Sequence, residues 1–281
     1  MSLKTGFRAP TLLATASLFL ALSAGPAQAA LTTFQQSALV PSTVLYTDII
    51  GGGIGDVVVM TGGGNHAGVG ALDGRNDDGF SGPIDFGFDF SFFGNTYSSF
   101  YANNNGNISF TAGNSSYIPT GPIGASIPTI SAWFGDVDTR NPDSGVLHLR
   151  QDTNQTILTW DGVGYFGNRA DRLNTFQMIV RGPDYAIPDG EGAIGFFWLN
   201  MPWESTNTST TAAVGFGDGT GDAVVLEGSN TSGLNEVVAF HRTWFTTGLA
   251  PVDPNPVPEP GSLALLGLGM LGLLAGRRRL S

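Results

Sequence analysis

Residues 85–92 read Asp-Phe-Gly-Phe-Asp-Phe-Ser-Phe, and this stretch decides the fold. A phenylalanine stands at every second position, and Asp, Gly or Ser stands between. Successive side chains of a β-strand point to opposite faces, so a period of two turns one aromatic face toward a core and one polar face toward water. The stretch therefore predicts a half-buried β-strand.

Turn residues separate this strand from other short apolar runs. Asn105-Gly106 is a strong hairpin signal, because both residues tolerate the positive φ of tight turns. Strands are predicted at 86–92, 97–102, 108–110, 129–134, 146–150, 156–160, 175–181, 193–199, 212–216, 224–226 and 243–245. No convincing amphipathic helix occurs between residues 31 and 251, so the pattern predicts an all-β, antiparallel, sandwich-like single domain. Residues 30–75 are expected to be a Gly-rich N-terminal extension. The irregular region 51–78 is expected to be loosely packed or to form an edge strand.

The charge balance limits the partners. Between Arg8 and Arg277 seven Arg stand against 23 acidic residues, a net charge near −16. Such a surface repels phosphate backbones, which excludes nucleic acid as a partner, and it attracts divalent cations. Cysteine is absent, so stability outside the cell must come from the core or from bound ions.

The N-terminus has the three-part layout of a secretory signal peptide. Lys4 and Arg8 form a basic region, residues 12–22 are apolar, and Ala27 and Ala29 form the small-x-small cleavage pattern. A membrane anchor is the alternative, but the apolar stretch is short for a span of about 20 residues. Residues 1–29 are therefore predicted to be a cleaved signal peptide.

The C-terminus carries a second membrane signal. A Pro-rich linker at 248–257 precedes an uncharged stretch at 261–275, and Arg277, Arg278 and Arg279 follow it. An apolar stretch that ends in Arg is a stop-transfer signal with the Arg cluster on the cytoplasmic side. The alternative is a helix packed on the domain. The order of proline spacer, apolar stretch and Arg cluster instead predicts a short transmembrane helix.

Pro258, Glu259 and Pro260, the apolar stretch and the Arg cluster together resemble the PEP-CTERM sorting signal over residues 258–281. The resemblance implies a bacterium that makes exopolysaccharide. It also implies that a membrane-embedded exosortase recognises the tail at Pro-Glu-Pro and removes it. The expected route is an inner-membrane-anchored precursor, then the cell surface or extracellular matrix.

Residues 76–247 resemble the nidogen-like (NIDO) domain. The matching pieces occur in the family's order, and they are 77–79, 92–94, 105–110, 133–140, 145–146, 174–177, 214–216 and 228–229. The resemblance implies an extracellular β module of adhesion and matrix proteins, and it brings no catalytic residues. This chain reverses the usual aromatic order at Trp133-Phe134 and lacks the adhesive modules of animal proteins, which leaves animal-type partners in doubt.

Two loops hold candidate calcium ligands. Asp136, Asp138 and Asp143 occupy one loop, and Asp77 and Asp78 the other. Carboxylates in turns are hard oxygen ligands that suit Ca²⁺. Neither loop matches an EF-hand, because Arg140 stands where a ligand belongs. The alternative is that these residues make turns and solvate strand ends.

Enzyme signatures are missing. The three histidines are scattered, no Gly-x-Ser-x-Gly motif occurs, and the acidic residues do not single out a catalytic pair. Trp203, between Pro202 and Glu204, is expected to be exposed and to contact carbohydrate or protein.

These features predict an exported, non-enzymatic surface or matrix protein that adheres to exopolysaccharide or to neighbouring cells. Two alternatives stay open. One is a structural matrix component with no specific ligand, and the other is a polysaccharide-modifying enzyme.

Overall fold

The computed structural model describes residues 30–118, 126–204 and 211–253. The predicted signal peptide, with Ala27 and Ala29, lies outside these ranges. So does the predicted sorting tail, with Pro258, Glu259, Pro260 and the Arg cluster. Within the described ranges, no helix has the length and apolar character that a membrane span requires.

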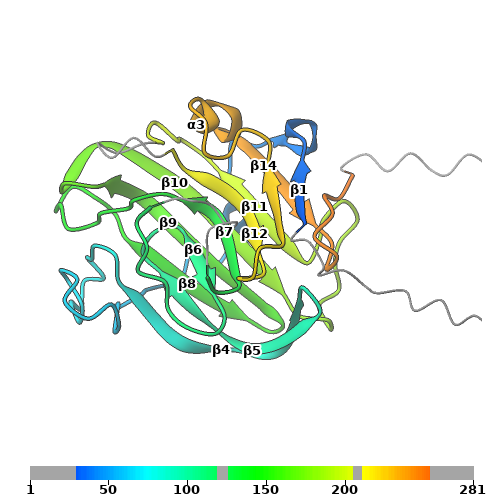
Figure 1. Ribbon diagram of the computed structural model, residues 1–281, viewed down its shortest axis with the longest axis horizontal. Coiled ribbons are helices and arrows are strands. Elements are labelled where there is room, and N and C mark those ends of the chain that lie inside the picture. Colours follow the sequence, from blue (N-terminus) through cyan, green and yellow to red (C-terminus); the bar gives the residue numbers. More distant parts are fainter. Residues whose placement is uncertain (1–29, 119–125, 205–210, 254–281) are drawn as a thin grey trace, which may run out of the picture.

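The chain folds as two seven-stranded sheets that pack face to face (Figure 1). The first sheet has the order β1 (Leu31–Phe34), β13 (Ala223–Leu226), β12 (Ala213–Gly217), β7 (Thr129–Phe134), β6 (Asn107–Ser109), β5 (Asn95–Asn103) and β4 (Phe80–Phe92). The second has the order β2 (Val40–Pro41), β14 (His241–Phe245), β11 (Ile194–Trp198), β10 (Arg169–Arg181), β9 (Gln155–Tyr165), β8 (Leu147–Asp152) and β3 (Asp56–Val57). Neighbouring strands are antiparallel except β1 and β13, which are parallel. The predicted all-β sandwich is confirmed.

The alternating phenylalanines lie as their period predicts. Phe86, Phe90 and Phe92 of β4 are buried and Phe88 is half-buried, while the residues between them are exposed. Phe86 packs against Phe100 of β5 with 4.5 Å between ring centroids. Aromatic pairs of this kind add to the burial of apolar area, so the edge strand is fixed on the core by its inward face.

Every strand predicted from residue 86 onward is present, but several are longer than predicted. β10 begins at Arg169 rather than at 175, because its first residues form an exposed hairpin with β9 whose charged side chains hide the alternation. Short helices also occur, namely η1 (Gln36–Ala38), α1 (Tyr46–Ile50) and α3 (Leu234–Val238). Runs of three to five residues carry too little periodicity to be read from sequence.

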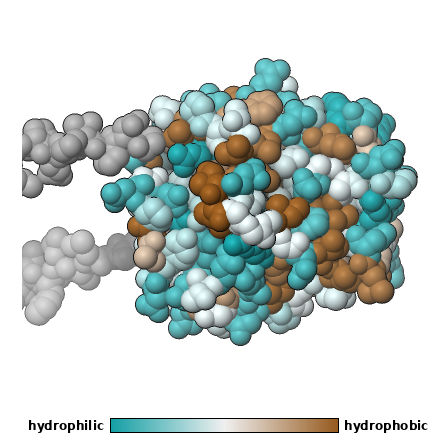
Figure 2. Space-filling model, turned by 180° about the vertical axis from the view of Figure 1, so that it is seen from behind, coloured by the Kyte–Doolittle hydropathy of each residue, from teal (hydrophilic) through white to brown (hydrophobic). Residues whose placement is uncertain are grey.

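The Gly-rich segment 30–75 joins both sheets at their edges. β1 pairs with β13, β2 with β14, and β3 with β8. Tyr46 of α1 packs on the outer face of the second sheet beside Phe197 and Trp244, in a second, smaller apolar cluster. On the face seen from behind, apolar residues are interspersed with hydrophilic ones (Figure 2).

Candidate metal centre

Three loops meet at the end of the sandwich where β7 finishes. They are residues 73–79 before β4, the turn 103–107 between β5 and β6, and residues 135–141 after β7. Asp77 and Asp138 form an isolated antiparallel bridge between the first and third loops. The meeting of these loops brings acidic residues that are distant in sequence into one site.

The turn 103–107 holds the other two loops in place. The side-chain amide of Asn104 donates to the carbonyl oxygen of Val137 at 2.6 Å, and that of Asn105 donates to Asp78 Oδ1 at 2.7 Å. Asn105 Oδ1 accepts the backbone N–H of Val137 at 2.8 Å. Both asparagines are buried. Buried amides that are fully hydrogen-bonded fix loop geometry, so this turn positions the acidic residues.

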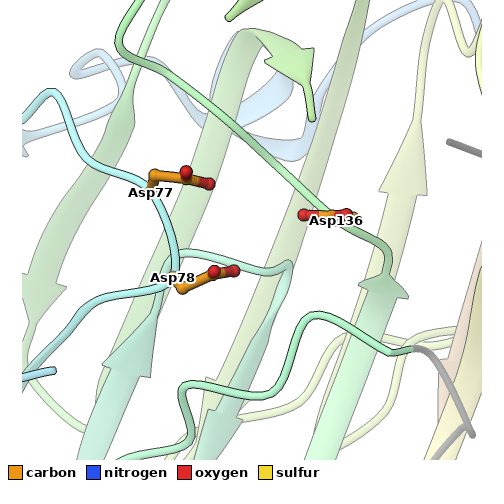
Figure 3. A group of neighbouring side chains, drawn as sticks. All are labelled: Asp77, Asp78 and Asp136. Atoms are coloured by element: carbon orange, nitrogen blue, oxygen red, sulfur yellow. The ribbon is translucent and has the colours of Figure 1, made fainter. Parts of the chain in front are cut away.

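One carboxylate oxygen from each of Asp77, Asp78 and Asp136 lies within 4.8 Å of the other two. Asp136 is 2% exposed, and the side chains of Asp77 and Asp78 are 15% and 13% exposed. Figure 3 shows the side chains of Asp77 and Asp78 extending from their loop toward Asp136. Three mostly buried carboxylates thus share one small space.

The surroundings of Asp77 and Asp78 disfavour the charged form of their carboxyl groups. The pKa of Asp77 is raised to about 7, mainly by burial and then by the negative charges of Asp138 and Asp78. The positive charge of Arg140 acts in the opposite direction. Burial also raises the pKa of Asp78, although the hydrogen bond from Asn105 and the charge of His66 oppose it. A bound cation would relieve this strain, because it favours the charged form of each carboxylate.

The donor set fits calcium in type and size. Ca²⁺ takes six to eight oxygen ligands at about 2.3–2.6 Å, so ligands on opposite sides of one ion lie roughly 4.8 Å apart. Asp77 Oδ1 is buried and has no hydrogen-bond partner among the described residues, so it has capacity to accept an ion. The residues present therefore match hard-oxygen coordination.

Asp138 and Asp143 differ from this cluster. Asp138 is fully buried, and its oxygens accept from Arg140 Nε at 2.8 Å, from Arg140 Nη2 at 2.5 Å and from the N–H of Asn168 at 2.7 Å. Asp138 thus holds the loop together. Asp143 is exposed and outside the cluster, because Asn141 Oδ1 accepts its N–H in a tight surface turn. Its prediction as a ligand beside the others is wrong.

The predicted exposure of Trp203 is also wrong. Trp203 is 1% exposed, and its ring N–H donates to the carbonyl oxygen of Val163 at 3.0 Å. Asn174 binds the backbone of Trp203 from both sides, donating to its carbonyl at 2.8 Å and accepting its N–H at 3.1 Å. These contacts draw the residue under Tyr165, so it packs the core and does not reach a ligand.

Asn104, Asn105 and Arg140 are site residues that the sequence did not assign. Arg140 Nη2 contacts Asp77 Oδ2 at 2.7 Å as well as Asp138, so it bridges the two loops. The run Asn-Asn-Asn-Gly-Asn at 103–107 was the available signal. Amide side chains beyond the two residues of a hairpin turn indicate backbone contacts to other segments.

Comparison with known proteins gives two family matches. A family model described as NIDO related matches residues 62–247, and one described as PEP-CTERM protein-sorting motif matches residues 256–279. Both resemblances expected from the sequence are confirmed.

Two curated relatives align with parts of the chain. Nidogen of Drosophila melanogaster is 29% identical over 140 residues, which is 38% of this chain and 10% of nidogen. Alpha-tectorin of Gallus gallus is 27% identical over 161 residues, which is 47% of this chain and 7% of alpha-tectorin. The match thus spans a tenth or less of either relative's length. No solved structure gave a significant match.

The NIDO-related match extends over the sandwich from β4 to β14 and includes every residue of the candidate metal centre. It covers well over half of the 281 residues. The chain belongs to the NIDO-related family.

Proposed function

We propose that this protein is exported and acts, without catalysis, as an adhesive component of the cell surface or the extracellular matrix. One observation carries the proposal. A NIDO-related domain that ends at residue 247 is followed in the same chain by a protein-sorting motif that begins at residue 256. The first indicates a module of adhesion and matrix proteins, and the second indicates a route to the outside.

The sorting step involves the tail alone. An exosortase-type enzyme recognises Pro258, Glu259 and Pro260, while residues 261–275 and the Arg cluster hold the precursor in the inner membrane. Replacing the three motif residues by alanine is expected to leave the protein in the membrane fraction, whereas the unchanged chain reaches the surface or the medium. Equal release of both would contradict this route.

Extracellular polysaccharide is the partner we favour, with neighbouring cell surfaces as a second. The acidic domain repels an acidic polysaccharide at low ionic strength, so direct contacts favour neutral sugars or contacts bridged by divalent cations. A glycan array probed with the purified protein, with and without calcium, tests this. Selective binding supports adhesion, and the absence of selective signal favours a structural component with no specific ligand.

Within this function, Asp77, Asp78 and Asp136 serve as a calcium site that ties the loop 73–79 to the loop after β7. The competing use of two close carboxylates is glycoside cleavage. Asp136 is 2% exposed, and the side chains of Asp77 and Asp78 are 15% and 13% exposed, so little carboxylate surface is open to a sugar chain. Glycoside cleavage needs the scissile bond to lie between two carboxyl groups, so this burial supports metal binding over hydrolysis.

Deletion of the gene tests the function as a whole. We expect reduced cell aggregation and biofilm, restored by the unchanged gene and not by a gene whose Pro-Glu-Pro motif is replaced by alanine. Unchanged aggregation after deletion would count against adhesion. Turnover of the host's exopolysaccharide by the purified protein, lost in Asp77→Asn, would instead revive the enzymatic alternative.

A further inference from the structure

The residue before the first strand contacts an acidic side chain that lies far away in the sequence. The backbone nitrogen of Ala30 lies 2.6 Å from Asp222 Oδ1, and the carbonyl oxygen of Ala30 accepts the N–H of Ala223 at 2.9 Å. Ala30 directly follows residue 29, where the sequence predicts signal-peptide cleavage. The contact therefore involves the nitrogen atom that cleavage would turn into a chain terminus.

Few other contacts hold the beginning of β1. Its residues pair in parallel with β13, from Leu31 opposite Ala223 to Phe34 opposite Leu226. Only Phe34, the last of them, is buried, and it packs edge-on against Phe245 with 5.0 Å between ring centroids. Leu31 is 57% exposed. The outer end of this edge strand is thus held by its pairing with β13 and by the contact between Ala30 and Asp222.

Asp222 ends a turn whose backbone hydrogen bonds do not involve Ala30. The carboxylate oxygen Oδ1 of Asp218 accepts the backbone N–H groups of Thr220, Gly221 and Asp222 at 2.7, 2.9 and 2.9 Å. The N–H of Asp218 donates to the carbonyl oxygen of Asp222 at 2.9 Å. This turn orders the backbone directly before β13, and it thereby fixes the point from which the Asp222 side chain extends.

We propose that Asp222 is the receptor for the α-ammonium group created by cleavage between Ala29 and Ala30, and that their ion pair fixes β1 on β13. Hydrolysis of that peptide bond consumes one water and leaves a carboxylic acid on Ala29 and an amine on Ala30. The carboxylic acid formed on Ala29 releases its proton, and the amine takes one up, so the products at neutral pH are a carboxylate and an ammonium group. A neutral N–H donor at Asp222 becomes a charged one, and charge-assisted hydrogen bonds are about twice as strong as neutral ones.

Formation of the ion pair depends on the cleavage position. A strand rises about 3.3 Å per residue, so a chain that began one residue earlier or later would carry its ammonium group roughly 3 Å from the place where Asp222 receives it. A start at Ala29 would leave the neutral N–H of Ala30 at Asp222, as in the uncleaved chain. Only a start at Ala30 makes the ion pair. This inference rests on the export in the proposed function, and it does not depend on adhesion or on calcium.

The composition of the chain makes the ammonium group directly measurable. Lys4 is the only lysine, and it lies within the segment that cleavage removes. The α-amino group is therefore the one primary amine of the processed chain. An amine-reactive reagent reports on this group alone, because only the unprotonated amine reacts.

The experiment uses the protein exported by its own host, purified from the surface or the medium. Mass spectrometry first identifies the N-terminal residue. The rate of acetylation by N-hydroxysuccinimidyl acetate is then followed from pH 6 to 9 for the unchanged chain, for Asp222→Asn, and for Asp189→Asn as an exposed control with the same charge change. A free α-amino group has a pKa of about 7.7–8.0, and a carboxylate partner raises it.

We expect a processed chain that begins at Ala30. At pH 7.5 we expect acetylation to be at least about threefold slower in the unchanged chain and in Asp189→Asn than in Asp222→Asn, since half a pKa unit corresponds to about that factor. Molar salt is expected to narrow the difference, because the pair is near the surface. Acetylation is also expected to lower Tm by roughly 1–3 °C in the unchanged chain and not in Asp222→Asn.

Each failure has its own meaning. A chain that keeps residues 1–29 would overturn both this inference and the export step, and a start at another residue would overturn this inference alone. Equal acetylation rates in the unchanged chain and Asp222→Asn, with a start at Ala30, would also overturn it. If Asp222→Asn does not fold, Asp222→Glu decides: it keeps the charge on a longer side chain, and slow acetylation in it is the expected result.

Discussion

Asp77 and Asp138 face each other as partners in an isolated antiparallel bridge, and both contact Nη2 of Arg140, at 2.7 and 2.5 Å. This arrangement joins the loop before β4 to the loop after β7 at the end of the sandwich. Asp78 and Asp136 lie beside it, so one guanidinium faces several carboxylates. The excess of negative charge is the physical basis of the first two predictions.

Without calcium, stability is expected to fall as pH rises from about 4 to above 7. The pKa of Asp77 is about 7 in the folded chain and 3.8 ordinarily. Between these pH values the folded chain binds more protons than the unfolded chain, so the free energy of unfolding falls with rising pH, and the loss is complete above pH 7. Asp77→Asn removes this loss. We expect it to raise the free energy of unfolding by about 1 kcal/mol at pH 8 and not at pH 4, because partial exposure and the lost Arg140 contact reduce the effect.

Urea unfolding in the presence of a chelator, at pH 4, 6 and 8, measures this pH dependence. Asp143→Asn is the matched control, because Asp143 is exposed and outside the cluster. A gain of the same size in both variants, or a gain at pH 4, would show that Asp77 is not the responsible group.

Calcium is expected to raise Tm at pH 8, because an ion that binds only the folded chain stabilises it by mass action. At a concentration 100 times Kd the gain is about 2.7 kcal/mol. Asp136→Asn is expected to remove most of the rise and Asp143→Asn none of it. The rise is expected to shrink at pH 5.5, where Asp77 is protonated. No shift at millimolar calcium would end the calcium proposal.

The strands of this fold were predictable because a half-buried strand carries its two faces in the sequence. The alternation in residues 85–92 predicted β4, and the Asn105-Gly106 turn predicted the hairpin of β5 and β6. The edge strands β1 and β2 were not predicted. They are two to four residues long, and their pairing with β13 and β14 depends on parts of the chain that are far away in sequence.

The site was predictable only in part. The sequence marked both acidic loops, since clustered carboxylates are visible in it. It could not separate Asp136, which joins the cluster, from Asp143, which a surface turn directs away. That distinction depends on Asn104 and Asn105, whose buried amides fix where the loops meet. Contacts of this kind between segments leave no local pattern.

The close approach of the turn 103–107 to β7 makes a prediction for Gly106. Its φ is +77°, and a Cβ there would lie 1.7 Å from the carbonyl oxygen of Trp133. Gly106→Ala is expected to lower the free energy of unfolding by about 2–4 kcal/mol. The alanine would hold a strained φ, and the backbone near Trp133 would have to move away from its Cβ. Gly94→Ala is the control, because its φ is +76° and its Cβ would meet nothing within 4 Å.

We expect Gly94→Ala to lower the free energy of unfolding by about 1 kcal/mol, because only the positive φ is unfavourable for alanine there. Thermal unfolding of the two variants measures the difference. Gly106→Ala is also expected to lose the calcium-dependent rise in Tm, because it displaces the turn that positions Asp78. Equal losses of stability in the two variants would contradict the close approach.

Trp203 gives the last prediction, which separates packing from recognition. The ring N–H of Trp203 donates to the Val163 carbonyl, and its ring lies against Trp133 and Tyr165. Trp203→Phe therefore removes a buried hydrogen bond and leaves a cavity behind. We expect a loss of about 2–3 kcal/mol in stability. Glycan binding measured well below the lowered Tm is expected to stay unchanged. Phe166 is 39% exposed, so it serves as the exposed control, and Phe166→Ala is expected to change the stability little. Loss of glycan binding in a folded Trp203→Phe chain would return this residue to the ligand site.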